Sequence, residues 1–314
     1  MLWWCFPRGG TPAGLAWAFW AVSLLWPLPV GLGLGDRTPA VQEGRAPESS
    51  IDRQLQECVD RDRTTAGMLR CSIEAEQAWE REVQRAYEAL LQELDEPGRR
   101  GLQEAQQAWV AFRGAEVVWL SRLFNIPVGS MYPVLKAGDR IGLVEERALR
   151  LQSYQVSLRL GGGPPGRVQP REEEGSESPI DRRLQACIER DPTTANIVRC
   201  KEEALRAWDR ELNRVYRALM RELDARKLGK RVCGEEEGYC WQARPEVVAL
   251  ARQELRSAQW AWLTYRDAEF AWISWLYGRR EDPRSALAEV EERLSFVKAR
   301  VQKLKWYLEI LREI

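Results

Sequence analysis

The chain has 314 residues, and its 47 basic side chains balance its 47 acidic ones. It contains no histidine, which excludes triads, general bases and metal ligands built on imidazole. The first half leans mildly acidic and the second mildly basic, too weakly to predict nucleic-acid binding. We expect no cofactor, no metal site and no nucleic-acid partner.

The N-terminal residues 9–35 carry no charged side chain and include a long apolar run. This pattern is typical of a secretory signal. A membrane anchor is the alternative, since about 20 apolar residues span a bilayer, although Pro27 and Pro29 disfavour a durable helix. We expect residues 1–35 to be a signal peptide or an N-terminal anchor. The rest of the chain would be secreted, periplasmic or in the cell envelope, touching a membrane only if this segment is retained.

The rest of the chain is a tandem repeat. Residues 51–95 return as residues 180–224 with 26 of 45 positions identical. Further matches follow in the same order: WVAFRGAEVVW at 109–119 returns as WLTYRDAEFAW at 262–272, and LVEER at 143–147 returns as EVEER at 289–293. A fixed repeat of this kind indicates two copies of one module.

The domain boundaries follow from the repeat and from composition. The first module spans residues 51–160, and the second spans residues 180–314. Between them, residues 161–179 are rich in Gly, Pro and acidic residues, so we predict a flexible linker. The second module contains an inserted loop at 225–245 and ends in a long C-terminal helix.

Each module reads as a small helical bundle. A short helix from Ile51 to about Arg61 is followed by a break, where Thr64 or Thr65, and in the second copy Thr193 or Thr194, can cap the next helix. That helix has apolar residues at three- and four-residue steps, and two further amphipathic helices follow. The sequence therefore predicts an all-α fold: two tandem disulfide-pinned small helical bundles joined by a flexible linker.

The cysteines indicate an oxidising compartment. Six follow the apolar segment, and each copy repeats one pair at the same C-x12-C spacing. Pairing within each module is the simplest scheme, and the last two cysteines would close a loop inside the insertion. Free thiols or a zinc site are the alternatives, but there is no C-x2-C pair. The predicted disulfides are Cys58–Cys71, Cys187–Cys200 and Cys233–Cys240.

The ordered motifs resemble the lysozyme inhibitor LprI-like family of exported bacterial proteins. The pattern is Cys, Thr and Cys, then W-[DE]-x-E-L-N-x-x-Y, then W-x-x-[FY]-R-x-A-E. The first module matches less completely than the second. In the second module the matching residues are Cys187, Thr194, Cys200, Trp208, Asp209, Glu211, Leu212, Asn213, Tyr216, Trp262, Tyr265, Arg266, Asp267, Ala268 and Glu269.

This resemblance implies protein binding rather than catalysis. The family's named activity is inhibition of lysozyme, so the expected partner is a protein, most directly a lysozyme bound stoichiometrically. Members often have another cysteine after the R-x-A-E stretch, where this chain has Val117 and Phe270. The alternative is a cell-envelope scaffold or adaptor with no enzyme target. A cell-wall hydrolase is a more distant possibility, and we expect no enzymatic activity.

Two sets of side chains are candidates for a site. Arg113 with Glu116, and Arg266 with Glu269, lie three residues apart and are predicted to form an ion network, either locally or with Glu82 and Glu211. A structural role is favoured for this network over a ligand site. Trp260 and Trp275 align with Gln107 and Arg122 of the first copy, which makes them candidates for partner binding. The alternative is that they cover the inserted loop.

The C-terminal helix has a heptad stripe. Its first half would complete the second bundle. Its remainder would either pack on the long helix of its own module or pair with a second chain as a homodimer. The stripe comprises Leu287, Val290, Leu294, Val297, Val301, Leu304, Leu308 and Leu311.

Overall fold

The computed structural model describes residues 49–124, 131–159, 178–227, 231–233, 240–242, 245–279 and 282–313. The expected signal or anchor segment and nearly all of the expected linker lie outside these ranges. The elements are α1 (Ser50–Arg61), α2 (Thr65–Glu93), α3 (Glu96–Leu123), α4 (Tyr132–Arg159), α5 (Pro179–Arg190), α6 (Thr194–Lys227), β1 (Arg231–Cys233), β2 (Cys240–Gln242), α7 (Pro245–Gly278) and α8 (Pro283–Glu313).

The helices begin at the polar residues that the sequence supplies. The Thr64 hydroxyl accepts a hydrogen bond from the Gly67 amide at 3.0 Å, which caps α2. Thr193 accepts from the Asn196 amide at the start of α6, so both predicted threonine positions are used. Capping residues satisfy backbone N–H groups that have no partner inside the helix.

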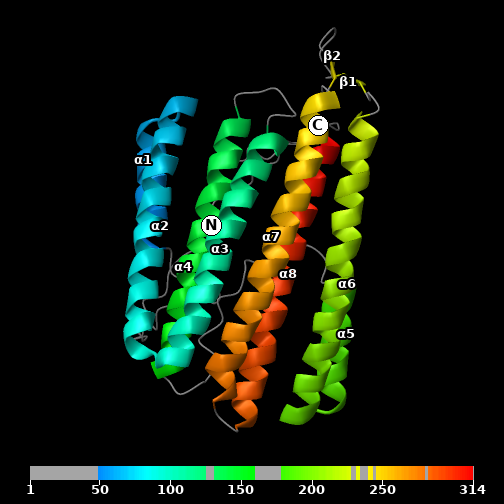
Figure 1. The fold of residues 1–314 in the computed structure, drawn as a ribbon. Coiled ribbons are helices and arrows are strands. Elements are labelled where there is room, and N and C mark those ends of the chain that lie inside the picture. The colour runs from blue at the N-terminus through cyan, green and yellow to red at the C-terminus, as the bar shows by residue number, and fades with distance from the viewer. Residues whose placement is uncertain are drawn as a thin grey trace, which may run out of the picture.

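The central feature of the fold is that the third helices of the two copies pack against each other. The most extensive helix pairing in the molecule joins α3 of the first copy to α7 of the second. On either side, α4 packs along α2 and α8 packs along α6. Figure 1 shows α3 and α7 side by side in the middle, with α1 and α2 at one edge and α5 and α6 at the other.

The all-α class and the two disulfide-pinned helical units are confirmed. The structure adds that the two units do not stand apart, because one hydrophobic core runs through both copies. The buried apolar residues of α3 and α7 cover each other. The insertion contributes the antiparallel pair β1–β2, in which Cys233 and Cys240 are backbone partners. Their side chains lie outside the described part of the structure, so their disulfide stays a prediction.

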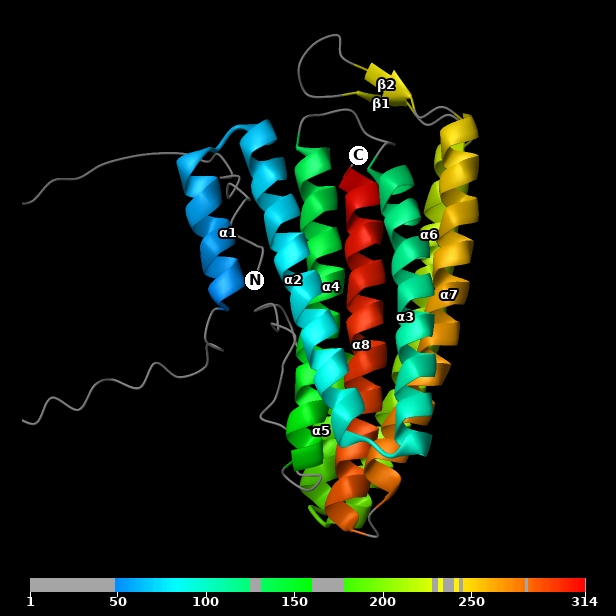
Figure 2. The ribbon, with the colours of Figure 1, turned by 60° about the vertical axis from the view of Figure 1, so that its left-hand side comes forward.

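The C-terminal helix α8 buries its heptad stripe inside the chain. Val297, Val301, Leu304 and Leu311 are fully buried, and α8 packs along α6 of its own copy. Figure 2 shows α8 between α4 and α3 rather than projecting from the bundle. The stripe is therefore covered without a second chain, as in the intramolecular alternative, and it gives no support to a homodimer formed through this helix.

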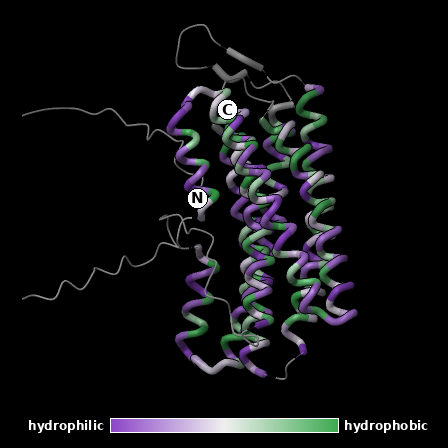
Figure 3. The backbone as a smooth tube through the Cα atoms, turned by 90° about the vertical axis from the view of Figure 1, so that its left-hand side faces the viewer, coloured by the Kyte–Doolittle hydropathy of each residue, from purple (hydrophilic) through white to green (hydrophobic). Residues whose placement is uncertain are grey.

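Hydropathy along the helices follows the same arrangement. In Figure 3 hydrophobic and hydrophilic segments alternate along every long helix, as expected for amphipathic helices around a shared core. Within the described ranges, none of the helices combines the length and apolar character needed to cross a bilayer.

Candidate functional site

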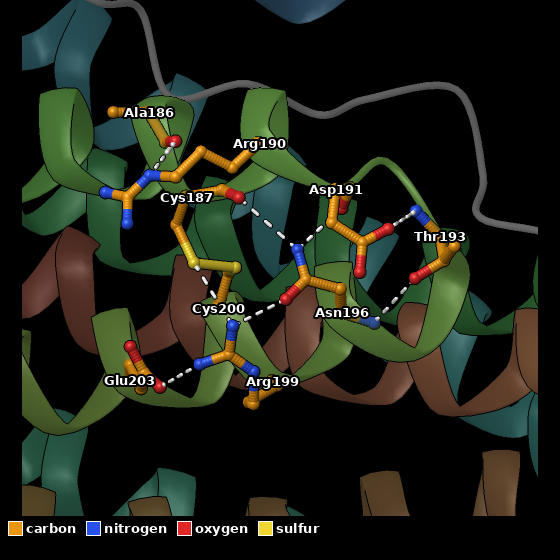
Figure 4. Close-up of a disulfide and its surroundings, with 9 residues drawn as sticks. All are labelled: Ala186, Cys187, Arg190, Asp191, Thr193, Asn196, Arg199, Cys200 and Glu203. Atoms are coloured by element: carbon orange, nitrogen blue, oxygen red, sulfur yellow. Dashed lines mark hydrogen bonds and ion pairs between the residues drawn. A yellow bond between two sulfur atoms is a disulfide. The ribbon is translucent and has the colours of Figure 1, made fainter.

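The disulfides fasten the two short helices to the bundle. Cys58–Cys71 joins α1 to α2, and Cys187–Cys200 joins α5 to α6. Figure 4 shows the second bridge beside Asn196, whose side-chain amide donates to the carbonyl oxygen of Cys187 at 3.3 Å. The first copy has Gly67 at the equivalent position, where an added Cβ would meet the Asp62 carboxylate. The turn between the short and the long helix is therefore filled by a side chain in each copy: by Asp62 in the first and by Asn196 in the second.

The two copies meet at a pair of equivalent aromatic residues. Phe112 of α3 and Tyr265 of α7 stack with ring centroids 5.7 Å apart and an interplanar angle of 15°. Gly98 lies against Trp275, and Gly101 lies near Trp272. These contacts show that α3 and α7 run antiparallel, so the copies are related by an approximate twofold axis near the stacked rings.

A buried polar cluster lies on one side of this crossing point. The Glu116 carboxylate of the first copy accepts hydrogen bonds from Arg300 of the second copy at 2.6 and 3.1 Å. The Tyr307 hydroxyl donates to the same carboxylate at 2.8 Å, and Arg300 also donates to Gln259. Both members of the ion pair are buried.

The cluster related to it by the twofold axis lies on the other side. Glu269 of the second copy accepts from Arg147 of the first copy at 2.8 and 2.9 Å. Tyr154 donates to Glu269 at 2.7 Å, and Arg147 donates to Gln106 at 2.9 Å. Each copy therefore supplies the glutamate of one cluster and the arginine of the other, which locks the copies together.

A second layer of ion pairs follows the same symmetry. Lys303 of α8 pairs with the buried Asp139 of α4, and Arg150 of α4 lies 3.7 Å from Glu292 of α8. Burial raises the pKa of Asp139 to about 6, against the opposing effect of Lys303. Burial also raises the pKa of Glu292, although Arg150 opposes it. Both carboxyls thus hold their protons more tightly than they would in water.

These contacts correct one step of the sequence alignment. Matching LVEER with EVEER makes Arg293 the counterpart of Arg147, but in the structure Arg147 and Arg300 make equivalent contacts. The true register is seven residues further along α8. Arg293 instead contacts Glu289 and Ser274.

Arg113 and Arg266 do not pair with Glu116 and Glu269. Arg113 pairs with Glu76 and Glu80 of α2, and Arg266 pairs with Asp209 and Asp267. The predicted alternative partners, Glu82 and Glu211, lie elsewhere: Glu82 pairs with Arg85, and Glu211 pairs with Arg214 and Lys305. Sequence reasoning missed Arg147, Arg300, Tyr154 and Tyr307. The sequence feature that could have identified them is a polar side chain at a position on the apolar face of its helix.

The polar clusters hold the two copies together inside the core. Glu116 and Glu269 are fully buried. Each accepts hydrogen bonds on both carboxylate oxygens, and in each case the donors are one arginine and one tyrosine. Because both carboxylates are buried and accept these hydrogen bonds, their oxygens are shielded from solvent. Among the described residues no group of His, Cys, Asp or Glu side chains is arranged to hold a metal ion.

The two candidate tryptophans have different surroundings. Trp260 on α7 is 73% exposed. Trp275 stacks on Trp272 with ring centroids 5.1 Å apart, and its ring occupies the space that a Cβ at Gly98 would need. Trp275 is therefore a contact between the copies, whereas the Trp260 side chain is exposed to solvent.

Comparisons with known proteins agree with this architecture. A family model described as lysozyme inhibitor LprI matches the chain twice, over residues 58–151 and 187–304. The crystal structure of an uncharacterized protein from Burkholderia thailandensis is similar, with 25% sequence identity and a TM-score of 0.53. That match covers 84% of this chain and 98% of the other chain, so it spans both copies. No curated protein matches the chain.

Proposed function

Since the chain belongs to the lysozyme inhibitor LprI family, we propose that it acts by binding another protein, most directly a lysozyme, in a stoichiometric complex. Blocking an enzyme requires a surface rather than a catalytic centre. Burial of the polar residues Glu116, Glu269, Arg147 and Arg300 supports this proposal, because their role is then to stabilise the fold rather than to contact a substrate. The outer surface is left for recognition.

The exposed face of the α3–α7 pair is the candidate contact surface. Trp260 protrudes there, and large aromatic residues are frequent anchors of protein interfaces. Because α3 and α7 run antiparallel, Trp260 lies level with the segment of α3 around Gly114, where no atom would obstruct an added Cβ. The exposed Val110 lies one turn away on α3. This face therefore offers an aromatic anchor beside the uncharged residues Val110 and Gly114.

Charge provides a second support. Residues 49–93, which form the α1–α2 edge, contain ten acidic and six basic side chains. An acidic edge speeds encounter with a basic enzyme such as many lysozymes. The disulfides support an oxidising compartment outside the cytoplasm, where such an enzyme would be met.

The test is a titration of lysozyme with the purified chain, following lysis of cell walls. Inhibition should be complete near one equivalent and should be lost after reduction of the disulfides. Trp260→Gln, which installs the residue of the first copy, should weaken inhibition at least tenfold. Val156→Gln, an exposed apolar position on α4, is the matched control.

An envelope scaffold or adaptor is the second candidate. It would leave lysozyme active at every ratio while the protein remained folded with intact disulfides. Retained inhibition in Trp260→Gln would keep the proposed function but exclude the α3–α7 face as the contact surface.

A further inference from the structure

One exposed face of α6 carries five arginines at helical spacing. They follow one another at intervals of four, four, three and four residues, so they line one side of the helix over about 22 Å. All five are exposed. We call this set the arginine stripe: Arg206, Arg210, Arg214, Arg217 and Arg221.

The stripe carries more positive charge than its neighbours neutralise. Arg214 is held by both oxygens of Glu211 at 2.6 Å, and Arg206 lies 3.4 Å from Glu202. Among the described residues, Arg217 donates only to the backbone carbonyl of Asn213. Within the described part of the chain, Arg210 and Arg221 make no hydrogen bond or ion pair. An exposed row of guanidinium groups that are only partly paired with carboxylates favours binding of an anionic partner.

The fold itself does not require these arginines. The equivalent positions on α2 of the first copy are Gln77, Arg81, Arg85, Glu88 and Gln92. That helix packs against α4 as α6 packs against α8. The positive stripe is therefore a property of one copy, laid over a framework that both copies share.

The charge also differs across the whole bundle. Residues 178–227, which form the α5–α6 edge, contain twelve basic and nine acidic side chains. This edge lies opposite the acidic α1–α2 edge (Figure 1). A planar anionic surface would attract one edge and repel the other, and so would orient the molecule. A small soluble polyanion could bind the basic edge without being affected by the acidic edge, so the opposite placement of the two edges would not favour its binding.

We infer that the arginine stripe docks the protein on the phosphate headgroups of an anionic lipid bilayer. Guanidinium groups form paired hydrogen bonds with phosphate, and a straight helix presents them to a flat surface together. The α1–α2 edge then faces the solution. This inference does not depend on the proposed function, since attachment to lipid is measured without lysozyme.

The experiment is co-sedimentation of the full chain with vesicles of phosphatidylcholine alone or mixed with phosphatidylglycerol. The wild type should bind the anionic vesicles preferentially and should be released by high salt. Arg206→Gln/Arg217→Gln/Arg221→Gln should bind them about a hundredfold more weakly, since each basic residue near such a surface contributes roughly fivefold. Binding to phosphatidylcholine alone reports the apolar N-terminal segment and should be equal for both proteins.

The control removes three exposed arginines from the opposite edge. Arg53→Gln/Arg81→Gln/Arg85→Gln lowers the net charge equally and should leave vesicle binding unchanged. Equal losses in both variants would show that only net charge matters and would overturn the inference. So would equal binding to anionic and neutral vesicles, or a preference of the wild type for soluble polyphosphate over anionic vesicles. Circular dichroism of each variant confirms that the helices are intact.

Discussion

Phe112 and Tyr265 occupy the same position in the two copies, and yet they stack on each other with ring centroids 5.7 Å apart. Because α3 and α7 run antiparallel, this contact lies close to the approximate twofold axis that relates the copies. The tandem copies are therefore organised as a homodimer is, with the two protomers fused into one chain. Around this point the buried pairs Glu116–Arg300 and Glu269–Arg147 cross from one copy to the other.

Removal of one partner from a crossed ion pair should destabilise the whole bundle. Arg300→Met leaves the Glu116 carboxylate buried without its cation, which costs about 3–5 kcal/mol in the free energy of unfolding. Urea unfolding followed by circular dichroism measures this. Arg300→Met/Glu116→Gln should recover a large part of the loss. Arg85→Gln, in an exposed ion pair, should change stability by less than about 1 kcal/mol. A small effect of Arg300→Met would mean that the cluster is open to water.

The contact of Gly98 with Trp275 should be sensitive to a single methyl group. An added Cβ at Gly98 would lie 2.2 Å from the Trp275 ring, so Gly98→Ala should cost about 1–3 kcal/mol. The equivalent pair on the other side of the axis is Ala251 with Arg122. Gly98→Ala/Trp275→Arg, which copies that pair, should therefore be more stable than the sum of its single changes predicts. Strict additivity in urea unfolding would show that the ring moves aside at no cost.

Asp139 should give the stability a specific pH dependence. Its pKa is raised from 3.8 to about 6, because burial disfavours the carboxylate more than Lys303 favours it. The folded state thus binds the proton more tightly than the unfolded state, so folding becomes more favourable as pH falls through this window. Relative to Asp139→Asn, the wild type should gain about 2–3 kcal/mol between pH 7 and pH 4.

This gain is checked by urea unfolding of both proteins at each pH, with Glu74→Gln, an exposed acid on α2, as the control. A pH-independent difference between wild type and Asp139→Asn would contradict the raised pKa. A difference of opposite sign would mean that the ion pair with Lys303 dominates over burial.

The two copies should stay together after the chain is cut between them. A protease site inserted near residue 168, in the predicted linker, would yield two fragments whose α3 and α7 still bury each other. We expect them to elute together in gel filtration without denaturant. Glu116→Gln/Glu269→Gln, which removes both crossed carboxylates, should allow separation. Separation of the wild-type fragments would show that the linker, and not the shared core, holds the copies together.

Much of the local structure could be predicted from the sequence because it depends on neighbours along the chain. The repeat, the threonine caps, the disulfides Cys58–Cys71 and Cys187–Cys200, and the apolar helix faces all follow from spacing and side-chain chemistry. Trp79, Trp109 and Trp208 lie in the core as their positions on those faces predict.

Which copy covers which apolar face depends on contacts between residues far apart in the sequence. The apolar face of α3 could be buried by a helix of its own copy or by α7. The spacing of apolar residues along α3 would be the same in both cases. The register of α8 shows the same limit: a shift of seven residues turns a helix by only about 20°, so Arg293 and Arg300 present similar faces to a pattern search. The observed register places Arg300 beside the buried carboxylate of Glu116, which requires a cation at that level of the bundle. Because Glu116 is far from α8 in the sequence, a local pattern does not reveal this requirement.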